Sequence, residues 1–190
     1  TADVRLNVVQ LIQKKIFVGN WVLEKVLTQS VEDLFALRDT IIENDRVWVN
    51  LPRRMMNWHK SIKDFLFCDK SLNFHLSGGN WGLACNAIHF IDLVSWWTES
   101  DIIEIDPSHL KEWYPSKRKN FWEISGKLVV YYSNDIYLEL NSNRDKSTPM
   151  SLRISSKTCD WVLNESEGKF YGPNNFTISG ATQLANNGGS

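Results

Sequence analysis

The stretch "FVGNWVLEKVLTQSVEDLFALRDTII", residues 17–42, decides the fold class because an apolar strand pattern runs directly into an amphipathic helix pattern. Phe17–Gly19 and Trp21–Leu23 form a compact apolar stretch rich in strand formers, which predicts a strand buried on both faces. Ser30 precedes Asp33 by three residues where the helical pattern begins, as in a capping box. The apolar residues of the predicted helix share one face: Leu34, Phe35, Leu37, Ile41 and Ile42.

The flanking segments extend this stretch to a helix, strand, helix, strand order. Apolar residues repeat at helical spacing within 3–15, where Asp3 is the expected N-cap. Val47–Leu51 alternates as a strand before Pro52. Because parallel neighbouring strands need a helix to return the chain across the sheet, residues 1–51 are predicted to be half of a doubly wound, Rossmann-like α/β domain with a parallel sheet.

Beyond this boundary the pattern changes to that of an α+β domain, which we expect to occupy residues 52–184. Residues 55–67 and 83–97 have helical periodicity, and Gly78 and Gly79 suggest a turn at 77–80 after a strand at 72–76. Short strand patterns separated by turn residues predict a mainly antiparallel sheet. These patterns lie at 121–124, 127–132, 136–140, 151–155, 161–163 and 169–171. Residues 185–190 have the composition of a flexible tail.

The composition excludes several classes of function. A net charge of -1 with scattered basic residues argues against a nucleic-acid partner. Neither a membrane-length apolar run nor a signal-peptide pattern is present, so we expect a cytoplasmic protein without a membrane partner. The odd count of three widely spaced cysteines fits reduced thiols. The four histidines are not paired with them at metal-binding spacing, so no metal site is expected.

Two groups of residues could carry chemistry. Glu24 and Lys25 follow the predicted strand at its carboxyl end, where ligands bind in open α/β sheets, although a solvated surface pair is the simpler interpretation. Cys85, His89 and Asp92 share one helical face, and a histidine beside a carboxylate can move protons near neutral pH. A packing histidine is the more common case. The tryptophans likewise fit a core or interface better than a sugar-stacking platform.

Three motifs resemble the glucose-fructose oxidoreductase, inositol dehydrogenase and MocA family. They are "VLEKVLTQSVEDLFAL" at 22–37, "VWVNLPRRM" at 47–55 and "GGNWGLACNAIHFIDLVSWWT" at 78–98, and together they span most of the chain in the family's order. The resemblance implies a strand-end motif at the nicotinamide, with Glu24 and Lys25 at its first two positions. Lys25 would act in both catalysis and cofactor binding. Val26 stands where the family usually has proline.

The resemblance also assigns roles in the second domain. His89 matches the family's catalytic histidine, and Cys85 occupies the position of the aspartate four residues before it. Asp92 matches the acidic residue that follows. The segment of Arg53 and Arg54 often reaches ligands, so the resemblance implies cofactor binding by Arg53 and substrate binding by Arg54, Cys85 and Asp92.

The expected function is that of an NAD- or NADP-dependent oxidoreductase acting on a sugar, sugar derivative or polyol, with homo-oligomers formed through the second-domain sheet. The family's glycine-rich phosphate loop is absent from the first strand-to-helix turn. We therefore expect an internal fragment that is inactive by itself. The main alternative is a non-catalytic glycan-binding or oligomer-assembly module, which the departures at Cys85 and Val26 favour. A thiol enzyme using Cys85 and His89 is a more distant alternative.

Overall fold

The computed structural model describes residues 1–41, 46–66, 71–157 and 160–180, and it divides into two compact units that meet in the chain between Pro52 and Arg53. Each unit encloses a separate cluster of buried apolar side chains. Expectations for Ile42, Phe67, Cys68, Cys159 and the tail at 185–190 lie outside the described residues.

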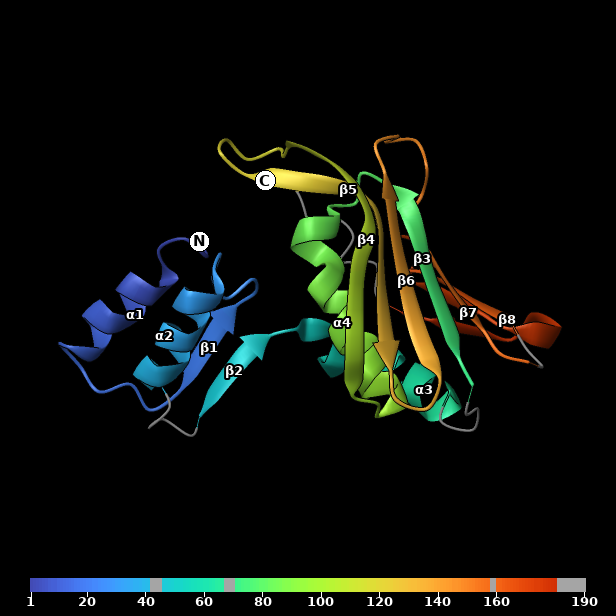
Figure 1. Ribbon diagram of the computed structural model, residues 1–190. Helices are drawn as coiled ribbons and strands as arrows, with labels where there is room; N and C mark the ends of the chain where they lie inside the picture. The colour runs from blue at the N-terminus through green and yellow to red at the C-terminus, as the bar shows by residue number, and fades with distance from the viewer. Residues whose placement is uncertain (42–45, 67–70, 158–159, 181–190) are drawn as a thin grey trace. The chain divides into compact units, whose positions relative to one another are not determined.

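The first unit has the predicted order of helices and strands. It contains α1 (Arg5–Gln13), β1 (Trp21–Glu24), α2 (Val31–Ile41) and β2 (Val47–Asn50), shown in blue and cyan in Figure 1. The two strands are parallel and in register, so Trp21 lies beside Val47 and Glu24 beside Asn50. This confirms the predicted parallel sheet and corresponds to a partial Rossmann domain.

Only one face of this small sheet is buried. Trp21 and Leu23 are 8% and 6% exposed and pack with residues of both helices, but the intervening Val22 is 70% exposed. Its neighbour Trp48 on β2 is 53% exposed. The prediction of a strand buried on both faces is therefore wrong, because within this unit the helices cover a single face. Phe17–Gly19 precedes β1 without joining it.

The two helix starts differ in how well they were predicted. The Asp33 backbone N–H donates to Ser30 Oγ at 3.0 Å, which confirms the N-terminal cap of α2. The N-cap of α1 is Val4, which makes no side-chain cap bond. The expectation of Asp3 as the cap was wrong by one position, since the helix begins at Arg5.

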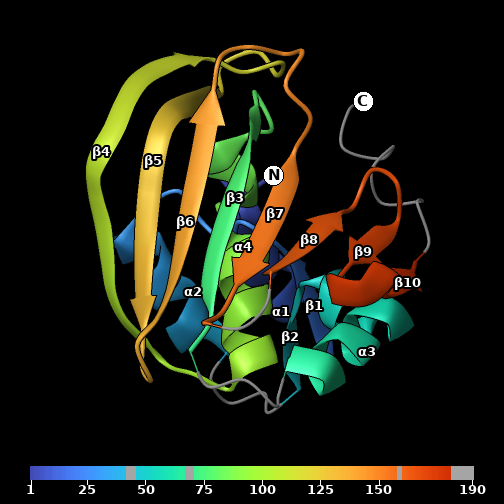
Figure 2. The same cartoon turned by 90° about the vertical axis from the view of Figure 1, so that its right-hand side faces the viewer.

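The second unit is an α+β domain with a twisted sheet (Figure 2). Its helices are α3 (Asn57–Leu66) and α4 (Leu83–Thr98), preceded by a short 3-10 turn at Pro52–Met55. Its strands are β3 (Asn73–Gly79), β4 (Ile102–Pro115), β5 (Trp122–Tyr132), β6 (Ile136–Asn143), β7 (Ser151–Ser155), β8 (Asp160–Asn164), β9 (Lys169–Tyr171) and β10 (Thr177–Ser179).

The strand order is β10-β9-β8-β7-β3-β6-β5-β4, which places β3 in the interior of the sheet. β3 runs parallel to β6 and antiparallel to β7, and the remaining neighbours are antiparallel. The predicted mainly antiparallel sheet is therefore confirmed. Buried side chains of α4, such as Phe90, Val94 and Trp97, share one core with Phe74 of β3 and Leu138 of β6.

Three sequence predictions for this unit need correction. β4 and β10 were not predicted, and the segments 121–124 and 127–132 form one continuous strand, β5. The turn expected at 77–80 begins later, because Ser77–Gly79 belongs to β3. A Cβ built on Gly79 would lie 1.4 Å from the Asp145 carbonyl oxygen, so this glycine permits a close approach of two backbones. Within the described ranges, no helix combines the length and apolar character needed to cross a membrane.

Candidate functional site

The carboxyl edge of the parallel sheet carries Glu24 and Lys25, as predicted. Glu24 is the last residue of β1 and is exposed, and its Oε1 accepts a hydrogen bond from Asn50 Nδ2 at the matching end of β2. Lys25 follows immediately and is half-buried. The two parallel strands therefore end together, with a carboxylate, an amide and an ammonium at one edge.

The turn after Lys25 is held by a residue that the sequence analysis did not single out. Arg5 of α1 donates from Nη1 to the carbonyl oxygen of Val26, and also to that of Leu27 at 2.5 Å. The peptide bond between Lys25 and Val26 is cis. Arg5 thus supplies a fixed contact at the position where the related motif carries proline. A partner 21 residues away leaves no local spacing signal in the sequence.

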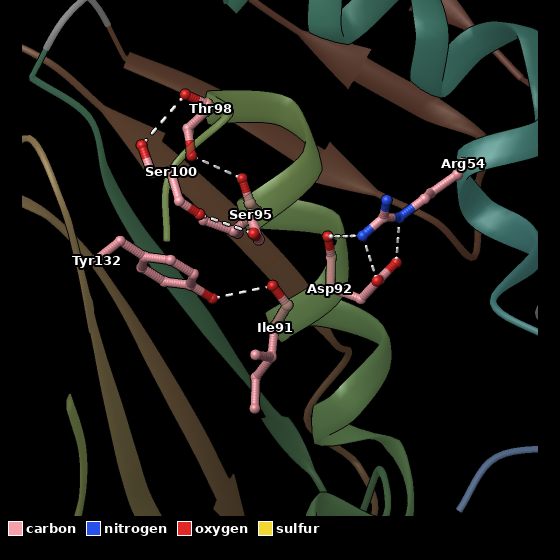
Figure 3. Close-up of polar contacts among 8 residues, drawn as sticks. Arg54, Ile91, Asp92, Ser95, Thr98, Ser100 and Tyr132 are labelled. Carbon is pink, nitrogen blue, oxygen red and sulfur yellow. Dashed lines mark hydrogen bonds and ion pairs between the residues drawn. The ribbon is translucent and has the colours of Figure 1, made fainter. Parts of the chain in front are cut away.

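In the second unit, α4 presents Cys85, His89 and Asp92 outside its buried apolar stripe. Cys85 is exposed, while His89 and Asp92 are half-buried. Asp92 is held by Arg54, whose Nε donates to Oδ2 at 2.6 Å and whose Nη2 contacts Oδ1 and, at 3.4 Å, the Asp92 carbonyl (Figure 3). This bidentate pair fixes the carboxylate on the helix.

The carboxyl-terminal half of α4 is fixed to the sheet and to the following loop (Figure 3). The hydroxyl of Tyr132 on β5 donates to the Ile91 carbonyl at 3.0 Å, and Ser95 Oγ donates to the Ser100 carbonyl at 2.7 Å. Burial raises the pKa of Tyr132, so its hydroxyl keeps its proton and remains a donor. The helix that carries His89 is therefore hydrogen-bonded to β5 at Ile91, the residue before Asp92, in addition to its apolar packing.

Arg53 lies in a buried ionic cluster rather than on the surface. Its Nε and Nη2 donate to the two carboxylate oxygens of Glu165, each at 2.6 Å, and its guanidinium lies 4.7 Å from the centre of the Phe90 ring. The side chains of Arg53 and Glu165 are 13% and 8% exposed. Sequence reasoning missed Glu165 because 112 residues separate it from its partner.

His59 completes this cluster. Its Nε2 lies 3.4 Å from Glu165 Oε1, and the centre of its fully buried ring lies 4.4 Å from that of Trp58 and 5.5 Å from that of Trp97. Burial lowers the pKa of His59, so the imidazole is neutral near pH 7. Burial would raise the pKa of Glu165, but the Arg53 hydrogen bonds and the nearby His59 outweigh it and lower that pKa to about 2.

The predicted site residues therefore fall into distinct groups. Glu24 and Lys25 lie at the sheet edge of the first unit, and Cys85, His89 and Asp92 lie on α4 of the second. The structure pairs Arg54 with Asp92, and Arg53 with Glu165. Among the described residues, no group of three or more histidine, cysteine, aspartate or glutamate side chains could hold a metal ion.

No protein-family model and no curated protein matches the sequence. Solved structures do match its fold. UDP-N-acetylglucosamine 3-dehydrogenase GnnA from Acidithiobacillus ferrooxidans has a TM-score of 0.71 at 11% identity, over 95% of this chain and 62% of that one. A putative NADPH-dependent oxidoreductase from Desulfitobacterium hafniense has a TM-score of 0.69 at 11% identity, over 96% and 64%. The super-repressor mutant of Gal80p from Saccharomyces cerevisiae has a TM-score of 0.67 at 12% identity, over 92% and 57%.

The fold is that of the Gfo/Idh/MocA-type oxidoreductases. The match runs through both units of this chain but covers only 53% to 66% of the length of such structures. The resemblance inferred from the three sequence motifs is thus confirmed for the fold. Within the Gfo/Idh/MocA fold, the first unit corresponds to part of the Rossmann domain and the second to the carboxyl-terminal α+β domain.

Proposed function

We propose that this chain belongs to an NAD- or NADP-dependent oxidoreductase that acts on a sugar, sugar derivative or polyol. The observation that carries the proposal is the position of Lys25, directly after the carboxyl end of a strand in a partial Rossmann sheet. In open α/β sheets that edge is where ligands bind. The named dehydrogenase and oxidoreductase with the same fold support the reaction class.

The residues present fit the nicotinamide end of such a cofactor. Glu24, Asn50 and Lys25 place polar groups at one sheet edge. The 190 residues contain no Gly-x-Gly-x-x-Gly motif for the phosphates, and Gly78–Gly82, from the end of β3 to α4, has a different spacing. The bound cofactor would supply hydride transfer. Lys25 would bind the substrate oxygen: its ammonium would donate a proton to that oxygen when a carbonyl is reduced, and its neutral amine would accept the hydroxyl proton in the reverse oxidation.

On α4, we assign His89 as the second proton-handling residue, and Cys85 and Asp92 as residues facing the substrate. Substrate binding by Arg54 remains part of the proposal, and its guanidinium also holds Asp92 in a bidentate pair. Arg53 forms a buried ion pair with Glu165, and cofactor binding by Arg53 stays a prediction. We also propose that the protein forms a homo-oligomer through the second-domain sheet and that it is located in the cytoplasm.

Titration of NADH and NADPH against the whole protein, followed by nicotinamide fluorescence, tests the proposal. We expect saturable binding of one cofactor. Lys25→Ala should lower turnover of a sugar or polyol by about 10²-fold or more, the range of general acid–base effects. Lys14→Ala, which alters an exposed lysine at the end of α1, is the matched control and should leave turnover unchanged. Full turnover in Lys25→Ala would remove this residue from the mechanism.

A non-catalytic glycan-binding or assembly module is the second candidate. Two sequence observations favour it: Cys85 replaces the aspartate and Val26 replaces the proline of the related motifs. The presence of a super-repressor mutant among proteins of this fold is consistent with it. Glycan binding that does not depend on NADH or NADPH, together with no turnover after Cys85→Asp, would make this the better account.

A further inference from the structure

The turn that follows Lys25 is anchored at both of its ends within the first unit. Before the turn, Glu24 at the end of β1 lies beside Asn50 and accepts a hydrogen bond from its side-chain amide. After the turn, the buried Thr28 donates from Oγ1 to the carbonyl of Ser30, the N-terminal cap residue of α2, at 2.9 Å. The residues between these two anchors belong to neither a helix nor a strand, so no regular backbone ladder fixes them.

Side-chain packing fixes only part of this turn. Leu27 packs against the buried apolar cluster of the first unit, but the side chain of Val26 is 42% exposed. A segment with few buried apolar contacts opens easily unless its backbone groups are bonded elsewhere. Valine also leaves its own backbone φ angle free, whereas a proline ring would fix it. The restraint on the backbone next to Lys25 must therefore come from outside the turn.

Arg5 supplies this restraint from a fixed point on α1. Its Nη1 donates to the carbonyl oxygens of both Val26 and Leu27, so one guanidinium holds two successive peptide groups. Arg5 is the first residue of α1, and that helix is anchored in the core of the first unit by Val9, which is 2% exposed. A guanidinium is always charged, and hydrogen bonds from a charged donor are stronger than those from a neutral one.

The position of the backbone at Lys25 matters because a lysine reaches its target through a flexible chain of four carbons. Where that chain starts decides which positions its nitrogen can occupy. A reacting group must be placed closely, since a displacement of about 1 Å can lower a rate by about 10²-fold. A contact that fixes the peptide groups directly after Lys25 therefore also fixes the starting point of its side chain.

We propose that Arg5 is a positioning residue for Lys25: by holding the carbonyls of Val26 and Leu27 against α1, it keeps the lysine at the edge of the parallel sheet. The inference rests on the proposed function, because Arg5 acts on the reaction only through Lys25. Arg5 acts on the backbone of the turn and not on the reacting atoms, so it is not a catalytic residue.

A double-mutant cycle on turnover of a sugar or polyol by the whole protein, with NADH or NADPH as cofactor, tests the role. Arg5→Met should lower kcat by about tenfold or more, and Arg5→Lys by less, because an ammonium keeps a charged donor. In a Lys25→Ala background, Arg5→Met should cause no further loss, since both changes remove the same group from the reaction. Arg38→Met, at an exposed arginine of α2 paired with Asp39, is the matched control and should leave kcat unchanged.

Backbone ¹⁵N relaxation gives a readout that does not need turnover. Order parameters at Val26 and Leu27 should be near about 0.85 in the parent protein and fall below about 0.6 in Arg5→Met. Unchanged order parameters, or losses of kcat that add to that of Lys25→Ala, would overturn the positioning role of Arg5 and leave the proposed function intact. A parent protein without turnover would overturn the proposed function instead, and a fall in the order parameters would then still support the hold of Arg5 on the turn. If Arg5→Met does not fold, Arg5→Lys takes its place in both measurements.

Discussion

Glu165 accepts two short hydrogen bonds from Arg53 in a nearly water-free position, with the His59 ring against the same carboxylate. Removing one partner of a buried pair leaves the other charge without compensation, which is much more costly than losing a surface pair. The cluster joins the segment before α3 to the end of β8, so its effect is on the stability of the second unit.

We expect Glu165→Gln to lower the free energy of unfolding by about 3–5 kcal/mol, because the Arg53 guanidinium would stay buried without a counter-charge. Urea denaturation followed by tryptophan fluorescence measures the change. Glu167→Gln is the control, since Glu167 is exposed and bonds only to the Tyr171 hydroxyl among the contacts described. Similar losses for both variants would contradict a special role for the cluster.

The same residues set a dependence of stability on pH. The pKa of His59 is lowered below its ordinary 6.5 and that of Glu165 falls from 4.5 to about 2, so the unfolded chain binds more protons than the folded chain. Stability is therefore complete above about pH 6.5 and is lost as the pH falls, first through His59 and then, below about pH 4.5, through Glu165.

His59→Gln should remove the loss of stability that begins as the pH falls below about 6.5, which is the part attributed to His59. Urea midpoints measured between about pH 7.5 and pH 5 should fall in the parent chain and stay nearly constant in the variant, because the glutamine does not titrate. The further loss of stability below about pH 4.5, attributed to Glu165, should persist in His59→Gln. A profile that is identical in the two proteins would assign the acid sensitivity to other groups.

At the scale of single elements, α2 was predictable and β1 was only partly so. Ser30 and Asp33 lie three residues apart, and the local hydrogen bond between them requires no knowledge of the rest of the fold. Whether Val22 is covered depends instead on elements that are distant in the sequence. A continuous apolar run cannot distinguish a strand buried on two faces from one whose second face is open.

Ser30→Ala should destabilise the first unit by about 1 kcal/mol, the usual contribution of an N-terminal cap. Ser30→Asp should restore most of this loss, since its carboxylate can accept the same N–H and also lies favourably at the positive end of the helix. Thermal unfolding followed by circular dichroism measures both. Equal destabilisation by the two substitutions would show that packing, rather than capping, accounts for the effect.

A substitution at Gly79 tests the close approach between the backbone at the end of β3 and that of Asp145. Gly79→Ala would place a methyl group against the backbone of Asp145, which cannot move aside without disturbing the β6–β7 connection, so we expect a loss of about 2 kcal/mol or more. Gly19→Ala is the matched control, because its nearest contact is a side-chain atom of Phe17 at 3.8 Å. A neutral Gly79→Ala would mean that this connection is readily displaced.

At the scale of the whole molecule, the sequence predicted the change from a parallel to a mainly antiparallel sheet, but it missed β4. That strand carries Pro107 and three register irregularities, which break the alternation by which strands are recognised. The positions of Lys25 directly after a strand and of His89 on a helix were predictable from the sequence, and their roles in a site stay predictions. The pairing of Arg53 with Glu165 was not predictable, because only the folded sheet brings them together.

The two units have separate cores of very different size, so we expect two unfolding transitions. Leu37→Ala truncates a side chain that is 1% exposed in the smaller core, and it should shift only the transition of the first unit. Leu138→Ala, in the larger core, should shift only the transition of the second unit. Differential scanning calorimetry distinguishes them, and a single transition that moves with both variants would indicate one cooperative unit.

The central position of β3 limits the order in which the sheet can form during biosynthesis. This strand leaves the ribosome early, but both of its ladder partners, β6 and β7, are made more than fifty residues later. The local β5–β6 hairpin can form first, whereas the middle of the sheet must wait for distant partners. Pulsed hydrogen–deuterium labelling during refolding should accordingly protect amides of β5 and β6 before those of β3.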